Sequence, residues 1–362
     1  MEQNTKKRIN IPGTKLSVNN TQLLISSGIP SFDDIIGGGL AVGTVTLIEE
    51  DVTATYSKLI LQYFLAEGVV SGHSAFVGSQ EFNSSALINT LPAVIDTDDS
   101  SSVPISTGND EKLTIAWRYQ NIPTSQPKQV RKFGHFYDLT KTMDPSSIAS
   151  ADIKSWTYSE QSSTFSYAFV NPAYHDLLQS IKLTIDQGGF GLKSGSHRSI
   201  LRVALQSIGS PLWLANDYKV SGSAQTRDLD MFLFCLRALI RNAFATVVVT
   251  IPSTIIDEAS VNRCVHSSDT VIRLQAFAGT DLEHNKALSD YKGFFHVTKL
   301  SAINALCAKA LGPVDFAFKL RRKKFAIEEL HLPPELQDTS EREQDEIPSL
   351  SCGSAGRKLL EF

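Results

Sequence analysis

The chain has 362 residues, of which 42% are hydrophobic and 20% are charged, with a formal net charge of −4. This composition is typical of a soluble globular protein large enough for one big α/β domain. No apolar run approaches the roughly 18 residues that a membrane helix needs, and we expect no secretory signal in the N-terminal stretch MEQNTKKRIN. Four scattered cysteines without a CxxC pair are typical of reduced thiols, so we expect a cytoplasmic and nuclear location.

The acidic charge is concentrated at the C-terminal end. Residues 335–362 hold seven acidic and three basic residues, which gives −4 and leaves the rest of the chain neutral overall. We therefore expect an acidic C-terminal tail at 335–362, a flexible N-terminal arm at 1–20 and a single domain at 21–334. The polar stretches 93–111 and 120–170 are predicted to be disordered insertions in that domain. An anionic partner would have to be bound by local basic patches.

The first half of the predicted domain starts with a turn-rich segment at 26–43, in which three consecutive glycines allow a tight backbone path. Apolar alternation and helical spacing then predict the elements in order. They are a strand at 44–48, a helix at 57–67, a strand at 73–77, a helix at 82–91 stopped by Pro92 and, after the first insertion, a strand at 113–119.

The second half alternates helices and strands in the same way. Its predicted elements are a helix at 174–186, a strand at 200–208, a mobile loop at 214–226, a helix at 228–243, strands at 246–251, 270–277 and 294–300, and a hairpin with a basic turn at 316–330. This alternation predicts an α/β fold with a mainly parallel sheet and helices on both faces.

The stretch between the strand at 44–48 and the helix at 57–67 has the place and length of a phosphate-binding loop. In an ATPase this loop reads GxxxxGK[ST], because bare backbone N–H groups and one Lys surround the phosphates. Here it reads EDVTATYS, so both glycines are absent and Tyr56 stands in place of the Lys. We expect two carboxylates, Glu50 and Asp51, to face the phosphate position. We call residues 50–57 the degenerate loop. Its candidate site residues are Glu50, Thr55, Tyr56 and Ser57.

The run SSGIPSFDDIIGGGLAVGTVTLI at 26–48 resembles the entry to the ATPase core of the RecA and KaiC family. The segment RVALQS at 202–207 is similar to that family's Walker B strand, whose acidic residue holds Mg²⁺. Here Gln206 stands in place of the acid, and an amide supplies no negative charge. Glu81 falls near the family's water-activating glutamate, and Thr250 ends the strand that carries a polar sensor in that family. The resemblance implies a RecA-like fold with a degenerate P-loop.

Further stretches are similar to the RecA-like subunits of Elongator, a tRNA-modifying assembly, over about residues 11–337 and the extreme C-terminus. These stretches are GGGLAVGT, LIEED, YFLAEG, IAWRYQ, FGHFYD, GSPLW, AFKLRRKKF, LHLPPEL and Cys352-Gly353. This resemblance implies a hetero-hexameric ring with the paralogous Elongator subunits five and six. That ring joins the catalytic Elongator subcomplex, binds tRNA and supports carboxymethyl-type modification of the wobble uridine U34.

The chemistry of that modification belongs to another subunit, so the resemblance implies a chain that is not itself an enzyme. It implies no cofactor, with ATP expected only at interfaces shared in the ring. No HExxH motif or other metal-ligand spacing occurs, so we expect no metal site, and no GxSxG elbow occurs. The alternatives are an NTPase or kinase with a non-standard loop, and a DNA recombination mediator that shares the fold.

Candidate RNA contacts come from basic residues in loops. In the RecA-like plan, the loops after the Walker B strand and after the next strand face the ring's pore, and these map onto 214–226 and 252–266. A Gly/Ser loop nearby and the turn at 321–324 add further cations, which bind phosphates without reading sequence. The candidates are Lys219, Arg263, His266, Lys193, Arg198, Arg321, Arg322, Lys323 and Lys324. The turn is equally compatible with a salt-bridged seam between subunits or with a solvated surface.

Overall fold

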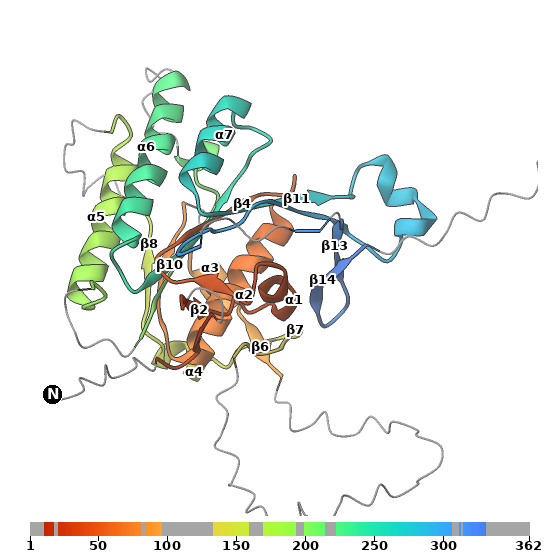
Figure 1. The fold of residues 1–362 in the computed structure, drawn as a ribbon, viewed down its shortest axis with the longest axis horizontal. Helices are drawn as coiled ribbons and strands as arrows, with labels where there is room; N and C mark the ends of the chain where they lie inside the picture. The colour runs from red at the N-terminus through yellow and green to blue at the C-terminus, as the bar shows by residue number, and fades with distance from the viewer. Residues whose placement is uncertain are drawn as a thin grey trace, which may run out of the picture. The chain divides into compact units, whose positions relative to one another are not determined.

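A computed structural model describes residues 11–17, 21–80, 84–95, 133–158, 169–192, 199–213, 222–305, 311–312 and 314–330 (Figure 1). The predicted strand at 113–119, the acidic tail at 335–362 and most of the insertion at 93–111 lie outside these residues. One correction concerns the N-terminal arm, because Thr14–Leu16 forms a strand, β1, and Ile11 is buried.

The centre of the molecule is a nine-stranded sheet with the order β14-β13-β12-β11-β4-β10-β9-β5-β8. The six strands from β11 to β8 are parallel, and β12, β13 and β14 are added antiparallel. The bounds are β4 (Val45–Glu49), β5 (Ser74–Gly78), β8 (Ile153–Trp156), β9 (Leu201–Leu205), β10 (Ala245–Ile251), β11 (Thr270–Ala276), β12 (Gly293–Lys299), β13 (Phe316–Leu320) and β14 (Phe325–Glu329). The predicted mainly parallel sheet is confirmed.

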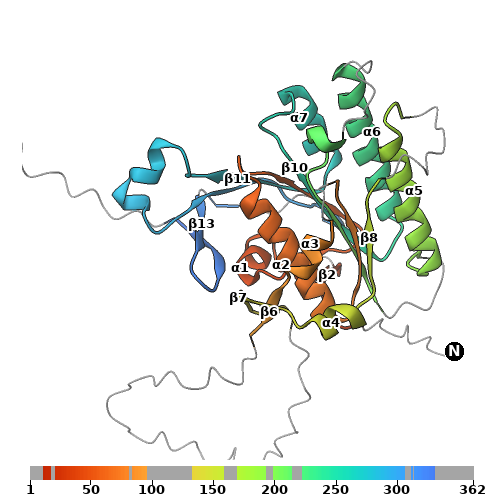
Figure 2. The same cartoon turned by 180° about the vertical axis from the view of Figure 1, so that it is seen from behind.

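Helices cover both faces of this sheet, as Figures 1 and 2 show. One face carries α5 (Pro172–Gln187), α6 (Gly222–Ile240) and α7 (Glu258–Ser267), and the other carries α1 (Pro30–Ile35), α2 (Thr55–Ser71) and the short α3 (Ser84–Asn89). Among the described helices, none is long and apolar enough to cross a bilayer.

The strand β10 shows why the layers form. Every residue of this strand is buried, because helices cover both of its faces. Val247 and Val249 belong to the core cluster under α5 and α6, whereas Val248 belongs to the cluster under α2. The alternation of a strand's side chains thus supplies one hydrophobic core on each side of the sheet.

The predicted disordered insertion at 120–170 is wrong for residues 133–158, which form β7 (Tyr137–Thr142), α4 (Pro145–Ser150) and β8. β7 pairs with β6 (Pro92–Val94), and β8 is the last strand of the central sheet. Two aromatic anchors, Tyr137 and Trp156, are buried and hold this segment. They are too few to stand out in a stretch dominated by polar residues.

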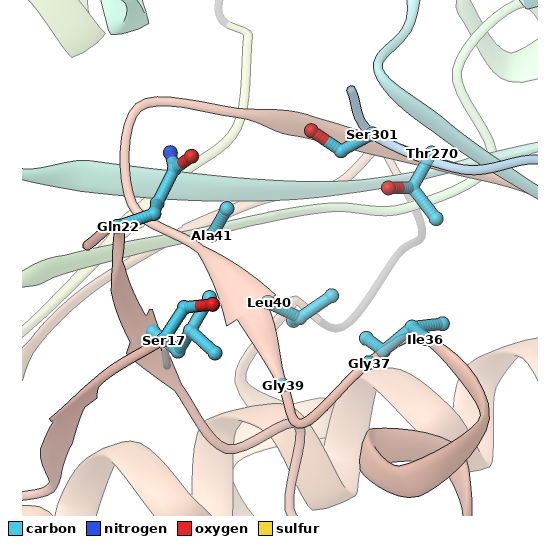
Figure 3. A pocket seen from close by; sticks show the side chains of 10 residues that line it. Ser17, Gln22, Ile36, Gly37, Gly39, Leu40, Ala41, Thr270 and Ser301 are labelled. Carbon is cyan, nitrogen blue, oxygen red and sulfur yellow. The ribbon is translucent and has the colours of Figure 1, made fainter. Parts of the chain in front are cut away.

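The glycine run precedes β3 (Leu40–Ala41), which pairs with β2 (Leu23–Ile25) in a three-stranded sheet with β1. Gly39 has φ of 132°, and a Cβ there would lie 2.6 Å from the carbonyl oxygen of Ile25. This turn helps to line a small pocket of about 70 Å³. Figure 3 shows the side chains that line it. Its lining residue Thr270 begins β11, so the pocket lies at the opposite end of the strands from the degenerate loop.

Candidate functional site

The degenerate loop joins the end of β4 to the start of α2, where a RecA-like ATPase binds phosphate. The first backbone N–H groups of any helix lack partners inside the helix and point outward, so they attract anions. Ala54 occupies the N-cap position of α2, and its side chain makes no capping hydrogen bond. Another group must therefore satisfy these donors.

That group is the carboxylate of Asp51, which is only 3% exposed. Its Oδ1 accepts hydrogen bonds from the backbone N–H of Tyr56 at 3.0 Å and of Ser57 at 3.1 Å. Its Oδ2 accepts from the backbone N–H of Thr55 at 3.1 Å and from the hydroxyl of Thr53 at 2.9 Å. The chain thus places its own anion where the phosphate of a nucleotide would lie.

The second carboxylate of the loop, Glu50, is buried and turns toward the ends of β9 and β10. It accepts hydrogen bonds from the hydroxyl of Ser207 at 2.8 Å and from that of Thr250 at 2.6 Å. Thr250 Oγ1 in turn accepts from the backbone N–H of Ser207 at 2.8 Å. The residue in the sensor position is therefore part of a closed network inside the chain.

Gln206 ends the strand that would carry the Mg²⁺-binding acid. Its Oε1 accepts a hydrogen bond of 3.1 Å from the hydroxyl of Ser79, at the end of the neighbouring β5. Neither partner carries a charge, so this position offers nothing to balance a divalent cation. Glu81 lies outside the described residues. Within the described part of the chain, no group of His, Cys, Asp and Glu is arranged to hold a metal ion.

Tyr56, in the position of the catalytic Lys, packs away from the loop. Its ring centroid lies 4.6 Å from that of Phe318 in β13 and 6.4 Å from that of Phe325 in β14. Burial against these rings, followed by the nearby carboxylates of Asp51 and Glu283, raises the pKa of its hydroxyl. Ser57 is buried, and its hydroxyl donates to the carbonyl of Ala54 at 3.2 Å.

The structure thus brings together the predicted loop residues and the strand ends that face them. The role of Asp51 as the acceptor for the helix N-terminus was missed, as were Ser207 and Ser79. An Asp shortly before a helix whose N-cap is an Ala is the signal that could have indicated the first. Ser79 depends on the register of β5 against β9, and Ser207 on the registers that join β9 through β10 to β4. Residue spacing gives neither.

The second candidate region is the basic turn, residues 321–324, between β13 and β14. Arg321 and Lys324 close it with reciprocal backbone hydrogen bonds of 2.9 and 3.2 Å, which confirms the predicted hairpin. Arg321, Arg322, Lys323 and Lys324 are all exposed. Among the described residues none of these four forms an ion pair, whereas the nearby Lys319 pairs with Glu328 at 2.9 Å.

The other predicted cations lie elsewhere. Lys193, Arg198 and Lys219 are outside the described residues. Arg263 and His266 are both exposed on α7, which replaces most of the loop predicted at 252–266 because Asp257 caps a helix there, accepting from Ser260 N at 2.9 Å. Arg263 is engaged in an ion pair with Asp230. The predicted loop at 214–226 also ends early, because α6 begins at Gly222.

A buried polar network ties the FGHFYD segment to the core. Glu67 of α2 accepts hydrogen bonds from the hydroxyl of Tyr137 at 2.7 Å and from the backbone N–H of His135 at 3.1 Å. Burial alone would raise the pKa of Glu67, but the His135 hydrogen bond and the charge of Arg202 lower it. Arg202 is itself fully buried, and its Nε donates to Nδ1 of His73 at 3.0 Å.

Comparison with known proteins places the chain in a family. A family described as PAXNEB protein matches residues 7–362. Proteins called Elongator complex protein 4 are 39% identical in Xenopus laevis, with 97% of this chain and 92% of the relative covered, and 40% identical in Danio rerio, with 98% and 94% covered. The protein of the same name in Homo sapiens is 36% identical, with 98% and 89% covered. The chain belongs to the PAXNEB family, together with these Elongator complex protein 4 sequences.

Proposed function

We propose that this chain is a non-catalytic RecA-like subunit of the Elongator complex. In this proposal it forms a hetero-hexameric ring with two paralogous subunits, and the ring binds tRNA and supports carboxymethyl-type modification of the wobble uridine. Its membership of a family whose relatives are named for Elongator supports the assembly. The observation that carries the non-catalytic role is the carboxylate of Asp51 at the phosphate position.

The charges around the loop argue against a nucleotide of its own. A phosphate at the N-terminus of α2 would have to displace Asp51 and then remain beside two carboxylates. At an effective dielectric constant of about 20, two unit charges about 4 Å apart repel by roughly 4 kcal/mol. An ATPase offsets this repulsion with Lys and Mg²⁺, but here Tyr56 and Gln206 occupy those positions. The proposal therefore assigns the chain no cofactor.

Calorimetric titration of the purified chain with Mg·ATP tests the non-catalytic role. We expect no heat of binding and no phosphate release. The same titration of the ring co-assembled with its two paralogues asks whether ATP binds at shared interfaces. ATP turnover by the lone chain that Glu81→Gln abolishes would overturn the proposal, because a complete site would then lie within this polypeptide.

Native mass measurement after co-expression with both paralogues tests the ring. A competition assay between folded tRNA and single-stranded DNA then tests the partner. We expect tRNA to win, whereas preference for DNA would favour a recombination mediator. Lys182→Ala, which removes an exposed cation on α5, is the control for neutralising cations of the basic turn.

A further inference from the structure

We propose that the basic turn and Phe136 form one RNA-binding surface, in which Phe136 stacks on an unpaired base while the cations of the turn hold the flanking phosphates. We call these five residues the turn–ring surface: Phe136, Arg321, Arg322, Lys323 and Lys324. This proposal rests on the proposed function, since it names the chemistry by which the ring would hold its RNA. Figures 1 and 2 both show β7 beside the β13–β14 hairpin.

Two distant parts of the chain meet at this surface. The backbone N–H of Leu139 in β7 donates to the carbonyl of Lys323 at 3.0 Å. The ammonium of Lys324 lies 4.9 Å from the centroid of the Phe136 ring, which is the arrangement of a cation–π contact. An aromatic ring is thereby set next to a run of four exposed cations.

Phe136 is 42% exposed, although its neighbour Tyr137 is 2% exposed. An exposed phenylalanine beside cations is what a protein that binds single-stranded nucleic acid uses, because every base has a flat face that stacks on an aromatic ring. The adjoining cations supply affinity for phosphates without reading sequence.

The backbone that carries Phe136 is fixed on both sides. His135 and Tyr137 both donate to the buried carboxylate of Glu67. The carbonyl of Phe136 accepts a hydrogen bond of 2.7 Å from the backbone N–H of Ile95. Because the backbone that carries Phe136 is held in place before binding, little ordering of the chain opposes stacking.

The aromatic ring of Phe136 also indicates which kind of partner this surface binds. A paired RNA helix or an acidic protein would use the cations, but a paired helix hides the faces of its bases. The flat ring adds affinity only when a base is unpaired. The surface therefore favours a single-stranded loop over a duplex and over an acidic protein seam.

The test uses the hetero-hexameric ring in which this chain is assembled with its paralogues. Two RNA probes of equal phosphate number are compared: a stem with an unpaired seven-nucleotide loop, and a blunt duplex. Binding is measured by fluorescence anisotropy at several salt concentrations. For Phe136→Leu we expect about tenfold weaker binding of the loop RNA, within the range found for loss of one stacked base, with an unchanged salt slope and unchanged duplex binding. Phe136→Tyr restores the loop affinity.

The paired variant Arg322→Ala with Lys323→Ala weakens both probes and lowers the salt slope by about one for each cation. The matched control for Phe136→Leu is Phe234→Leu, because Phe234 is a 66% exposed phenylalanine on α6, in the helical layer on the other face of the sheet. It leaves both affinities unchanged. Thermal unfolding and native mass confirm that each variant folds and assembles.

The outcomes separate the two proposals. If Phe136→Leu binds loop RNA like wild type while the paired variant weakens both probes, base stacking is wrong and RNA binding by the cations stands. If neither variant matters but the ring binds tRNA, the turn–ring surface is wrong and the proposed function stands. If the paired variant prevents assembly, the turn is a subunit seam and this inference fails. A wild-type ring that binds no RNA would overturn the proposed function itself.

Discussion

The carboxylate of Asp51 accepts a hydrogen bond of 3.0 Å from the backbone N–H of Tyr56, the residue that stands where an ATPase has its Lys. The two substitutions therefore act together. The acid satisfies the donors that a phosphate would have used, and the aromatic ring joins the core of the neighbouring hairpin. The loop lies at the position of a phosphate-binding loop, and its own carboxylate caps α2.

Replacing Asp51 tests that use. In Asp51→Ala three N–H groups of α2 lose their acceptor, so we expect the free energy of unfolding to fall by about 1–2 kcal/mol, the usual cost of losing a helix cap. Asp51→Asn keeps one acceptor oxygen and loses less. Chemical denaturation measures both, with Val52→Ala, at a side chain of the same loop that is 77% exposed, as a control that changes stability by less than about 0.5 kcal/mol. Equal stability of Asp51→Ala and wild type would contradict the assignment.

Replacing Tyr56 tests its contact with the hairpin. Tyr56→Ala removes a ring that packs on Phe318 and Phe325, and we expect a loss of about 2 kcal/mol. Amide hydrogen exchange should accelerate in β13 and β14, because the ring holds that hairpin against α2. Tyr56→Phe retains the packing and should behave like wild type. Unchanged exchange in both strands for Tyr56→Ala would show that the hairpin is held by other contacts.

The charge of Glu67 is expected to matter more than any single hydrogen bond it accepts. Glu67→Gln removes the largest opposing charge acting on the buried guanidinium of Arg202, and breaking a buried charge pair typically costs about 3 kcal/mol or more. Tyr137→Phe removes one donor to Glu67 and should cost about 1 kcal/mol. Thermal or denaturant unfolding ranks the two. The reverse order would mean that Arg202 does not depend on this carboxylate.

The buried His73 predicts sensitivity to acid. Burial, followed by the charge of Arg202, lowers the pKa of His73 from 6.5 to about 3. Its Nδ1 accepts from Arg202 and its Nε2 donates to the carbonyl of Pro12, so the folded chain requires the neutral ring. Between pH 6.5 and 3 the unfolded chain binds a proton that the folded chain does not. Stability should therefore fall as the pH falls through this range, by at most about 5 kcal/mol.

The test variant is His73→Asn, which retains an acceptor for Arg202. Its free energy of unfolding is measured at each pH and subtracted from that of the wild type. Asp33 titrates with the opposite sign, because burial raises its pKa from 3.8 to about 6. The folded chain holds that proton more tightly, so stability is lost as the pH rises toward 6. Asp33→Asn should thus give a difference curve of opposite slope. A flat curve for His73→Asn would rule out the neutral buried imidazole.

The layers of the fold could be predicted because burial on both faces leaves a direct mark on the sequence. The run TVVVTI has no charged residue and is β-branched throughout, and β10 is buried along its whole length. The sequences of β7 and β8 show no such apolar run, because these strands depend on contacts of Tyr137 and Trp156 with residues far away in the chain. Trp156, for example, donates to Asp176 of α5 at 2.8 Å.

The candidate site could be predicted as far as its missing groups. The loss of the glycines, and the presence of Tyr56 and Gln206 at the Lys and acid positions, can be read from the sequence once the motifs are aligned. The capping role of Asp51 could not be predicted, because the direction of its carboxylate depends on how the loop folds. The link between Phe136 and Lys324 was hidden for the same reason, since only the tertiary fold joins residues 188 positions apart.

The pairing of β6 with β7 has a consequence for how this chain can change. Ile95 and Phe136 are hydrogen-bonded neighbours at the two ends of the intervening stretch. The closure entropy of a chain that joins two points held this close rises by only about 0.6 kcal/mol for each doubling of its length. Because β6 and β7 fix both of these points, we expect residues inserted between the two strands to leave the register of the central sheet unchanged.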